Sequence, residues 1–314
     1  MTQLQATVVK NAGSHFLLSP LPLWAPLPAV LRGKVRLQKG TSTNPVAVGD
    51  HVLYTLPEGE VSEQNPASIT EVLPRDNYVI RRSTNLSRQS HVIAANLDQA
   101  VITVSLYFPE IKLPFLDRIL LTCEVYKVPA LIVLSKVDLY RAEAPEEVDR
   151  FIKIYEDAGY RVLQTSTRTG EGIGELRELC RGKVSLLTGE SGVGKSSLIK
   201  ALDPGLDPKT GSISEAHLQG RHTTSLYEMY RLGSGGFIID TPGLRGFGLV
   251  DLEKEEIGKY FPEMLKASAH CRFTPCTHTH EPGCAVKAAV EDGLISPERY
   301  SSYLGMLEED GKFR

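Results

Sequence analysis

A glycine-rich loop between two regular segments constrains the fold of this chain more than any other feature. Residues 189–196 read GESGVGKS and match the phosphate-binding pattern G-x-x-x-x-G-K-S in full. An apolar strand pattern at 183–188 precedes the loop, and a helical pattern at 195–202 follows it. In this context the glycines let the backbone wrap around phosphate groups, so that amide groups and a helix N-terminus face the anion. The pattern therefore predicts a nucleotide-binding α/β domain.

The side chains of this loop have expected roles. Lys195 is predicted to contact the β and γ phosphates, and Ser196 is predicted to bind Mg²⁺. The predicted phosphate-binding residues are Gly189, Glu190, Ser191, Gly192, Val193, Gly194, Lys195, Ser196 and Ser197.

A second motif, at the end of an apolar strand pattern, indicates which base is bound. Ser135, Lys136, Val137 and Asp138 resemble the guanine motif N-K-x-D. Asp138 can accept two hydrogen bonds from the N1 and N2 groups of guanine, which adenine does not supply, and the Lys136 stem can lie over the ring. Serine stands where the motif has asparagine, and it lacks the amide that would bridge the base and the phosphate loop. We therefore expect guanine selectivity with reduced affinity.

A third segment is a candidate for the loop that faces the base. Ser166 and Thr167 follow the next predicted strand, 161–165. The usual form of this loop is Ser-Ala, so Thr167 departs from it. We expect the loop to lie beside the guanine motif, because the carboxyl ends of neighbouring parallel strands meet at one edge of a sheet.

The two nucleotide motifs occur in the reverse of their usual order. An ordinary small GTPase has the phosphate loop first, whereas here Asp138 precedes Gly189. The chain therefore looks circularly permuted. This order also places the segment 240–243 directly before the C-terminal part of the chain. We accordingly expect a γ-phosphate-dependent shift to move that part relative to the N-terminal part.

Residues after the phosphate loop have the pattern of a magnesium and γ-phosphate site. Asp240 and Gly243 form a D-x-x-G segment after an apolar strand pattern, which places an acid near Mg²⁺ and a glycine amide near the γ-phosphate. The next residue is Leu244, where Ras-like enzymes carry a glutamine that orients water. Leucine cannot hydrogen-bond water. Either hydrolysis is slow or another group orients the nucleophile.

A polar segment between these two motifs contains the candidates for that group. Thr223 and Thr224 lie where a GTPase has a mobile threonine for Mg²⁺ and the γ-phosphate. His222 is the candidate to position or deprotonate the attacking water. Arg221 is the alternative, as a charge stabiliser. An exposed loop histidine without a catalytic role also fits the position of His222.

Three cysteines and a histidine near the C-terminus have the spacing of a structural zinc site. A reducing cytosol disfavours disulfides, so a cysteine cluster indicates a metal. The pattern C-x4-C-x-H-x5-C supplies the four ligands of a tetrahedral Zn²⁺. The predicted ligands are Cys271, Cys276, His278 and Cys284. His270 and His280 are alternatives to His278, which we prefer for the compact C-x-H step.

The hydrophobic periodicity predicts a multidomain chain with three different folds. Short strand patterns separated by turn residues occupy 4–73 and favour a five-stranded β-barrel of the oligonucleotide-binding (OB) kind. Alternating strand and helix patterns follow, and they indicate a parallel sheet covered on both faces. The C-terminal part contains helices around the cysteine cluster. The predicted domains are an OB-fold barrel at 1–74, a circularly permuted GTPase domain at 75–249 and a helical zinc-binding domain at 250–314.

Charge and hydropathy exclude several other classes. The net charge of −3 gives no global nucleic-acid signal, although residues 1–90 hold nine Lys and Arg against six Asp and Glu. No basic start followed by an apolar run is present at 1–13, so we expect no secretory signal. Prolines interrupt the apolar stretch 17–31, which is also too short to span a bilayer. We expect a cytoplasmic protein without a membrane segment.

The whole chain resembles the circularly permuted GTPases of the RsgA type. The segments that carry the resemblance are the N-terminal barrel, 95–99, 135–138, 189–197, 220–224, 240–243 and 271–284. The zinc ligands of that family fall on Cys271, Cys276, His278 and Cys284, and its proposed catalytic histidine falls on His222.

The resemblance also implies a function. It implies late maturation of the 30S ribosomal subunit, with binding to the immature particle through 16S rRNA, GTP hydrolysis stimulated by that particle, and release afterwards. The implied ligands are GTP and GDP with Mg²⁺, together with one structural Zn²⁺, and the implied state is a monomer.

Two other functions fit parts of the pattern. One is a nucleotide-gated RNA-binding or scaffolding module in which hydrolysis is incidental, which Leu244 favours. The other is a P-loop kinase or ATPase, which Asp138 disfavours because a carboxylate at that position has no clear use there. Measuring GTP turnover with and without 30S subunits distinguishes a GTPase from the scaffolding module. Competition by ATP distinguishes it from a kinase or ATPase.

Overall fold

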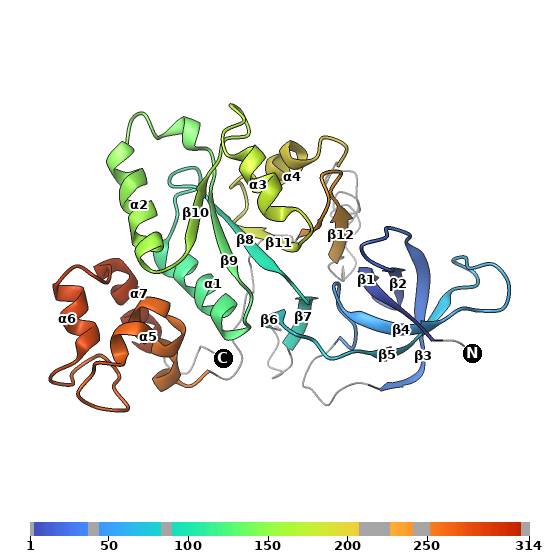
Figure 1. Cartoon of the computed structure of the whole chain (residues 1–314), viewed down its shortest axis with the longest axis horizontal. Helices are drawn as coiled ribbons and strands as arrows, with labels where there is room; N and C mark the ends of the chain where they lie inside the picture. The colour runs from blue at the N-terminus through green and yellow to red at the C-terminus, as the bar shows by residue number, and fades with distance from the viewer. Residues whose placement is uncertain (1–2, 37–43, 83–89, 207–226, 241–251, 309–314) are drawn as a thin grey trace, which may run out of the picture.

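The N-terminal part of the computed structural model is a closed five-stranded barrel (Figure 1). The structure describes residues 3–36, 44–82, 90–206, 227–240 and 252–308. The barrel strands are β1 (Leu4–Ala12), β2 (His15–Ser19), β3 (Leu27–Arg36), β4 (His51–Thr55) and β5 (Ala67–Val72). They pair in the order β1-β2-β3-β5-β4, and β4 returns to β1, which closes the barrel. Alternate residues of these strands form its core, as the sequence pattern predicts.

The central domain is a six-stranded, mostly parallel sheet. Its strands are β8 (Gln99–Val104), β9 (Ala130–Leu134), β10 (Arg161–Gln164), β11 (Val184–Gly189), β12 (Tyr227–Arg231) and β13 (Phe237–Asp240). They lie in the order β10-β9-β8-β11-β13-β12, and β12 alone is antiparallel to its neighbour in this part of the sheet. The direction of strand addition therefore reverses between β8 and β11. In open α/β sheets a ligand binds outside the carboxyl ends of the strands at such a point.

Helices cover both faces of the sheet. The helices are α1 (Leu113–Val125), α2 (Pro145–Asp157), α3 (Ile173–Cys180) and α4 (Lys195–Leu202), with a 3-10 turn η1 (Val137–Leu139) after β9. Side chains of α1 and α2 pack in one cluster with β8, β9 and β11, and side chains of α3 and α4 pack in another. Every residue of β8 is buried, because this strand lies between both layers.

Several strands were not predicted from the sequence. A hairpin of β6 (Tyr78–Arg82) and β7 (Ser90–Ala95) lies between the barrel and the sheet, and β12 adds an antiparallel strand. The barrel strand β4 begins only at His51. The residues before it, 47–50, form a turn in which Asp50 accepts a hydrogen bond from the Ala47 amide (2.8 Å). Short strands and turns of this kind leave a weak periodic signal.

The C-terminal part is helical, as predicted. It contains η2 (Lys254–Tyr260), α5 (Pro262–Ser268), α6 (Ala285–Glu291) and α7 (Pro297–Glu308). Figure 1 shows these helices at the end of the molecule opposite the barrel, next to α1. Leu121 of α1 is buried in the same apolar cluster as Phe261 and Tyr303. The barrel, the α/β domain and the helical part confirm the predicted fold class, whereas the exact domain boundaries stay a prediction.

Candidate nucleotide site and metal centre

The phosphate loop lies at the carboxyl end of β11, where the strand order reverses. Gly189 has a φ of 152°, and a Cβ atom built on it would lie 2.3 Å from the Thr103 carbonyl oxygen of β8. Gly194 precedes α4 with a φ of 105°. Side chains are strained at both positions, and Gly189 has no room for one. The glycines of the motif are therefore required by the path of the loop as well as by its ligand.

The ammonium group of Lys195 folds back over this loop. Its Nζ donates hydrogen bonds to the carbonyl oxygens of Gly189 (2.7 Å) and Glu190 (2.9 Å). Burial lowers the pKa of Lys195, whereas the carboxylates of Asp240 and Glu190 act to raise it. A nucleotide phosphate would replace these carbonyl contacts with a stronger, charge-assisted one.

Ser135 connects the guanine motif to the phosphate loop. Its buried hydroxyl lies 2.8 Å from the Val104 carbonyl oxygen and 2.7 Å from the Val193 carbonyl oxygen, and it donates its single proton to one of them at a time. Serine lacks the amide of asparagine but still contacts the phosphate loop, and the expected reduction in guanine affinity stays a prediction. The hydroxyl is short, but the ends of β9 and of the loop are close enough for it to reach.

Lys136 makes a second connection between the two motifs. Its backbone is left-handed (φ 58°), and its Nζ donates to the carbonyl oxygen of Gly192 (2.6 Å) and to that of Phe108. Ser135 and Lys136 therefore connect the predicted base-reading segment to the predicted phosphate loop by hydrogen bonds, although the two segments are far apart and in inverted order in the sequence.

The remaining residues of the base site lie at the same edge of the sheet. Asp138 is half-buried in η1, and its carboxylate makes no hydrogen bond among the described residues. Its neighbour Val137 donates its amide to the Thr165 carbonyl oxygen (3.2 Å), which joins the ends of β9 and β10. Ser166 is buried, and its hydroxyl accepts from the Thr169 amide (3.1 Å), whereas Thr167 is exposed. Of this pair, Ser166 stabilises the loop and Thr167 faces outward.

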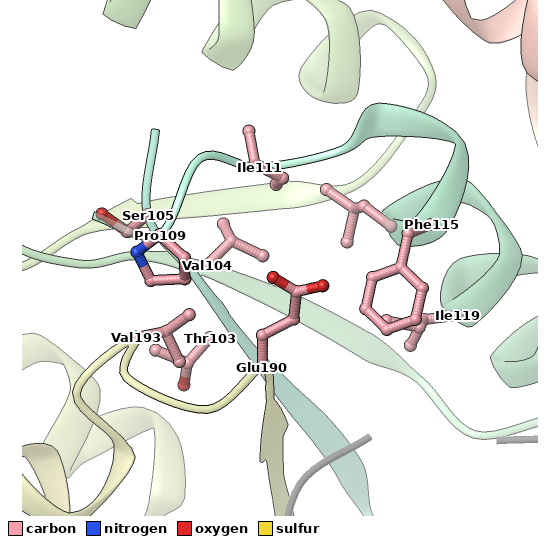
Figure 2. A pocket seen from close by; sticks show the side chains of 10 residues that line it. Thr103, Val104, Ser105, Pro109, Ile111, Phe115, Ile119, Glu190 and Val193 are labelled. Atoms are coloured by element: carbon pink, nitrogen blue, oxygen red, sulfur yellow. The ribbon is translucent and has the colours of Figure 1, made fainter. Parts of the chain in front are cut away.

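A small cavity lies beside the phosphate loop and next to α1 (Figure 2). Figure 2 shows the side chain of Glu190 reaching into it toward Phe115, with Ile119 beside that ring. The cavity volume is about 10 Å³, enough for about one water molecule. Glu190 of the phosphate loop thus lines this cavity together with residues of α1, an arrangement that the motif alone does not predict.

The predicted magnesium and γ-phosphate residues are described only in part. Asp240 ends β13 and is half-buried, with its backbone in register with Leu187 of β11. His222, Thr223, Thr224 and Gly243 lie outside the described residues.

The four predicted zinc ligands meet in space. Ligand atoms of Cys271, Cys276, His278 and Cys284 all lie within 4.8 Å of one another. The His278 Nδ1 atom is 3.4 Å from the Cys284 Sγ atom and 3.7 Å from the Cys271 Sγ atom. Around a tetrahedral Zn²⁺ with Zn–S bonds of about 2.3 Å, neighbouring ligands lie about 3.7 Å apart. The residues present therefore fit a closed, four-coordinate metal site.

Comparison with known proteins identifies the family. The model of the RsgA GTPase family matches residues 72–250. The small ribosomal subunit biogenesis GTPase RsgA of Bacteroides fragilis is 47% identical over 313 residues, which cover 99% of both chains. The chain belongs to the RsgA GTPase family. The corresponding protein of Porphyromonas gingivalis is 44% identical over 99% of this chain and 98% of its own.

Solved structures of similar proteins agree with this assignment. YjeQ from Thermotoga maritima has a TM-score of 0.77 at 32% identity and covers 98% of both chains. YloQ, whose structure is described as that of a circularly permuted GTPase, has a TM-score of 0.73 at 26% identity and covers 100% of this chain. As a member of the RsgA family, this chain is a GTP hydrolase with a circularly permuted fold. Among the described residues, no helix is long and apolar enough to cross a membrane.

A buried ion network joins the C-terminal helices of this RsgA family member to α1 of the GTPase fold, and the sequence did not predict it. Arg299 of α7 donates to Asp117 of α1 (2.8 Å) and, through two nitrogens, to Glu263 of α5 (2.8 and 3.1 Å). The guanidinium lies over the Phe261 ring at 4.5 Å from its centroid. We refer to Arg299, Asp117 and Glu263 as the Arg299 network.

The metal loop of this RsgA family member is supported by α7. The hydroxyls of Tyr300 and Tyr303 donate to the carbonyl oxygens of His278 and Thr277, both at 2.6 Å. Two aromatic residues three positions apart lie on the same face of a helix, so their spacing in the sequence indicates that both contact the same segment. These contacts hold the backbone of the predicted ligand His278, as outer-shell partners of metal sites commonly do.

Proposed function

We propose that this chain binds GTP at the carboxyl edge of the parallel sheet and that its hydrolysis serves maturation of the small ribosomal subunit. The observation that carries this proposal is the direct contact of the two nucleotide motifs, from Ser135 to Val193 and from Lys136 to Gly192. The names of the full-length relatives support the cellular role.

In this proposal each motif has a separate task. The amides of 189–197 and the Lys195 ammonium hold the phosphates. Asp138 accepts from the N1 and N2 groups of guanine, which excludes adenine. The loop of Ser166 and Thr167 closes the base site, with Ser166 as its structural member.

Hydrolysis requires the magnesium and water-positioning residues. Ser196 and Asp240 are proposed to hold Mg²⁺, directly or through water, with Thr223 or Thr224 completing its shell when GTP is bound. The metal ion neutralises charge that develops on the phosphates. His222 is proposed to position the attacking water, and Gly243 is proposed to offer its amide to the γ-phosphate. No glutamine follows Gly243, so a group from outside the motif is needed.

The cysteine cluster is proposed to hold one structural Zn²⁺. Three thiolates and one imidazole match the ligand preference of zinc. Four protein ligands leave no open position, so this ion would stabilise the fold of the C-terminal domain.

The binding partners follow from the family. We propose that the barrel (1–74) and the zinc domain (250–314) contact 16S rRNA of the immature 30S particle, with the GTPase domain (75–249) between them. The chain would act as a monomer in the cytoplasm, where ribosomal subunits assemble.

One experiment tests the enzymatic part of this proposal. GTP turnover is measured with the zinc-loaded chain alone, with purified 30S subunits and with 50S subunits as a control. We expect 30S subunits alone to stimulate turnover. Turnover that 30S subunits leave unchanged contradicts the proposal and favours the scaffolding alternative. Equal competition by ATP favours a kinase or ATPase.

A second experiment tests the role of His222. His222→Ala is expected to preserve GTP binding and to lower stimulated turnover by about 10²–10⁴-fold. Arg221→Ala, assayed in parallel, tests the neighbouring cation. Normal stimulated turnover of His222→Ala removes this residue from the mechanism.

A further inference from the structure

A buried tyrosine spans the turn that carries the guanine motif. Tyr140 directly follows η1 and is 3% exposed. Its hydroxyl reaches back and donates to the carbonyl oxygen of Ser135 (2.5 Å). The backbone of Tyr140 therefore lies at the C-terminal end of the turn and its hydroxyl at the N-terminal end. Lys136, Val137 and Asp138 lie between these two points of attachment.

The turn has a backbone conformation that needs support. Lys136 is left-handed (φ 58°), which is unfavourable for a residue with a side chain. The carbonyl oxygen that Tyr140 holds belongs to the peptide between Ser135 and Lys136. The direction of the Lys136 side chain toward Gly192 and the direction of the Asp138 carboxylate both depend on this turn. A contact that fixes the peptide therefore fixes both side chains.

The hydroxyl of Tyr140 is a dependable donor. Burial raises its pKa to about 12, so the group keeps its proton at neutral pH. Ser135, by contrast, has one hydroxyl proton for the carbonyl oxygens of Val104 and Val193, whereas the asparagine of the usual motif has two amide donors. Tyr140 accordingly adds a donor at the residue where this motif departs from its usual form.

A second tyrosine holds the ring of Tyr140 in place. Tyr107, in the loop between β8 and α1, meets this ring edge-on, with centroids 5.7 Å apart and an interplanar angle of 69°. The Tyr107 hydroxyl donates to Glu147 of α2. Aromatic pairs favour this edge-to-face arrangement, so the Tyr140 hydroxyl keeps a fixed direction.

We propose that Tyr140 is a positioning residue for guanine recognition. Its hydroxyl holds the turn in the conformation in which the Asp138 carboxylate accepts from both the N1 and the N2 group of guanine. Tyr140 acts through the backbone of the motif and not by touching the nucleotide. The inference rests on the proposed function, because it requires Asp138 to read the base.

Two nucleotides that differ in one group separate positioning from general support of the fold. IDP has the N1 group of GDP but lacks the N2 amino group, so it offers Asp138 one hydrogen bond instead of two. Dissociation constants of GDP and IDP are measured by calorimetry for the full-length, zinc-loaded chain with Mg²⁺. We expect the natural sequence to prefer GDP by about 10²-fold, as for one hydrogen bond to a charged group.

Three variants grade the contact. Tyr140→Phe keeps the ring and removes only the hydroxyl, and the preference for GDP should fall by about tenfold, chiefly through weaker binding of GDP. Tyr107→Leu removes the edge contact at a partly exposed position, and the preference should fall by about threefold. Tyr107→Phe is the matched control. It keeps the ring contact and loses only the bond to Glu147, so the preference should stay unchanged.

The outcomes have distinct meanings. An unchanged preference in Tyr140→Phe, or equal weakening of GDP and IDP, overturns the inference and leaves the proposed function intact. If Tyr140→Phe does not fold, Tyr107→Leu decides, and an unchanged preference there overturns the inference. A chain of natural sequence that binds GDP and IDP equally overturns the base-reading part of the proposed function, and the inference with it.

Discussion

Replacement of Arg299 is expected to lower the free energy of unfolding of the C-terminal helices, which the Arg299 network joins to the GTPase domain. In Arg299→Met the carboxylates of Asp117 and Glu263 stay buried without their cation. Breaking a buried ion pair by removing one partner costs about 3–5 kcal/mol. The methionine keeps much of the apolar contact with Phe261, so the loss reports chiefly on charge.

Urea denaturation of the zinc-loaded chain measures this loss. With a slope of about 2–3 kcal/mol/M, the midpoint of the transition that includes the zinc domain should fall by roughly 1–2 M. Arg150→Ala is the matched control. It removes an ion pair with Glu298 across the same pair of domains, but the Arg150 side chain is 70% exposed. We expect a loss of about 0–1 kcal/mol there.

The pH dependence of Arg299→Met tests the physical cause. Burial raises the pKa of Asp117, and Arg299 acts in the opposite direction. A raised pKa means that the folded state binds more protons than the unfolded state, so stability falls as pH rises through the folded value. Without Arg299 this effect grows. The deficit of the variant should therefore be larger at about pH 8 than at about pH 5.

A triple variant, Asp117→Leu, Glu263→Leu and Arg299→Met, provides the decisive comparison. Well-packed apolar residues often replace a buried ion network without loss, so this variant should recover most of the stability. Equal midpoints of Arg299→Met and Arg150→Ala would refute the reasoning. So would a triple variant that is no more stable than Arg299→Met.

Three further predictions concern the nucleotide and metal sites. Gly189→Ala should abolish nucleotide binding in a filter assay, because its Cβ would lie 2.3 Å from a backbone oxygen, whereas Gly174→Ala, with no atom within 4 Å, should bind normally. Asp138→Asn should weaken GTP binding by about 10²-fold or more and favour xanthosine triphosphate, whose C2 oxygen can accept from the new amide; unchanged GTP affinity would remove Asp138 from base reading. Cys284→Ser should lower bound zinc below one ion per chain by metal analysis, while His270→Ala should retain it; loss of zinc from His270→Ala would contradict the ligand assignment.

Local chemistry was predictable because it depends on short segments. The pattern from Gly189 to Ser196 specifies a strand, a loop and a helix, since its glycines are needed at fixed offsets. The spacing of Cys271 to Cys284 predicted a four-ligand metal site for the same reason. The strand β12 was missed although its burial alternates, because five residues are too few to distinguish a strand from a loop.

Contacts between distant segments were not predictable. Arg299 reads in the sequence as an ordinary surface residue of a helix, but Asp117, 182 positions away, makes it the centre of a buried network. The contact of Ser135 with the phosphate loop was not predicted for a similar reason. It depends on the distance of the hydroxyl to the Val193 carbonyl oxygen, which no local pattern contains.

The sequence by itself determined the class of this protein: its motifs, their inverted order and its three kinds of fold. Only the tertiary structure decided how the parts are joined. It joins the barrel to the sheet through the pairing of β1 with β12 and through a buried cluster that contains Val9 and Met229, and it fastens the C-terminal helices to α1 through a buried ion network. The physical reason is that motif chemistry depends on residue types at close spacing, whereas the stiffness of a joint depends on burial, and burial exists only when segments far apart in the chain have met.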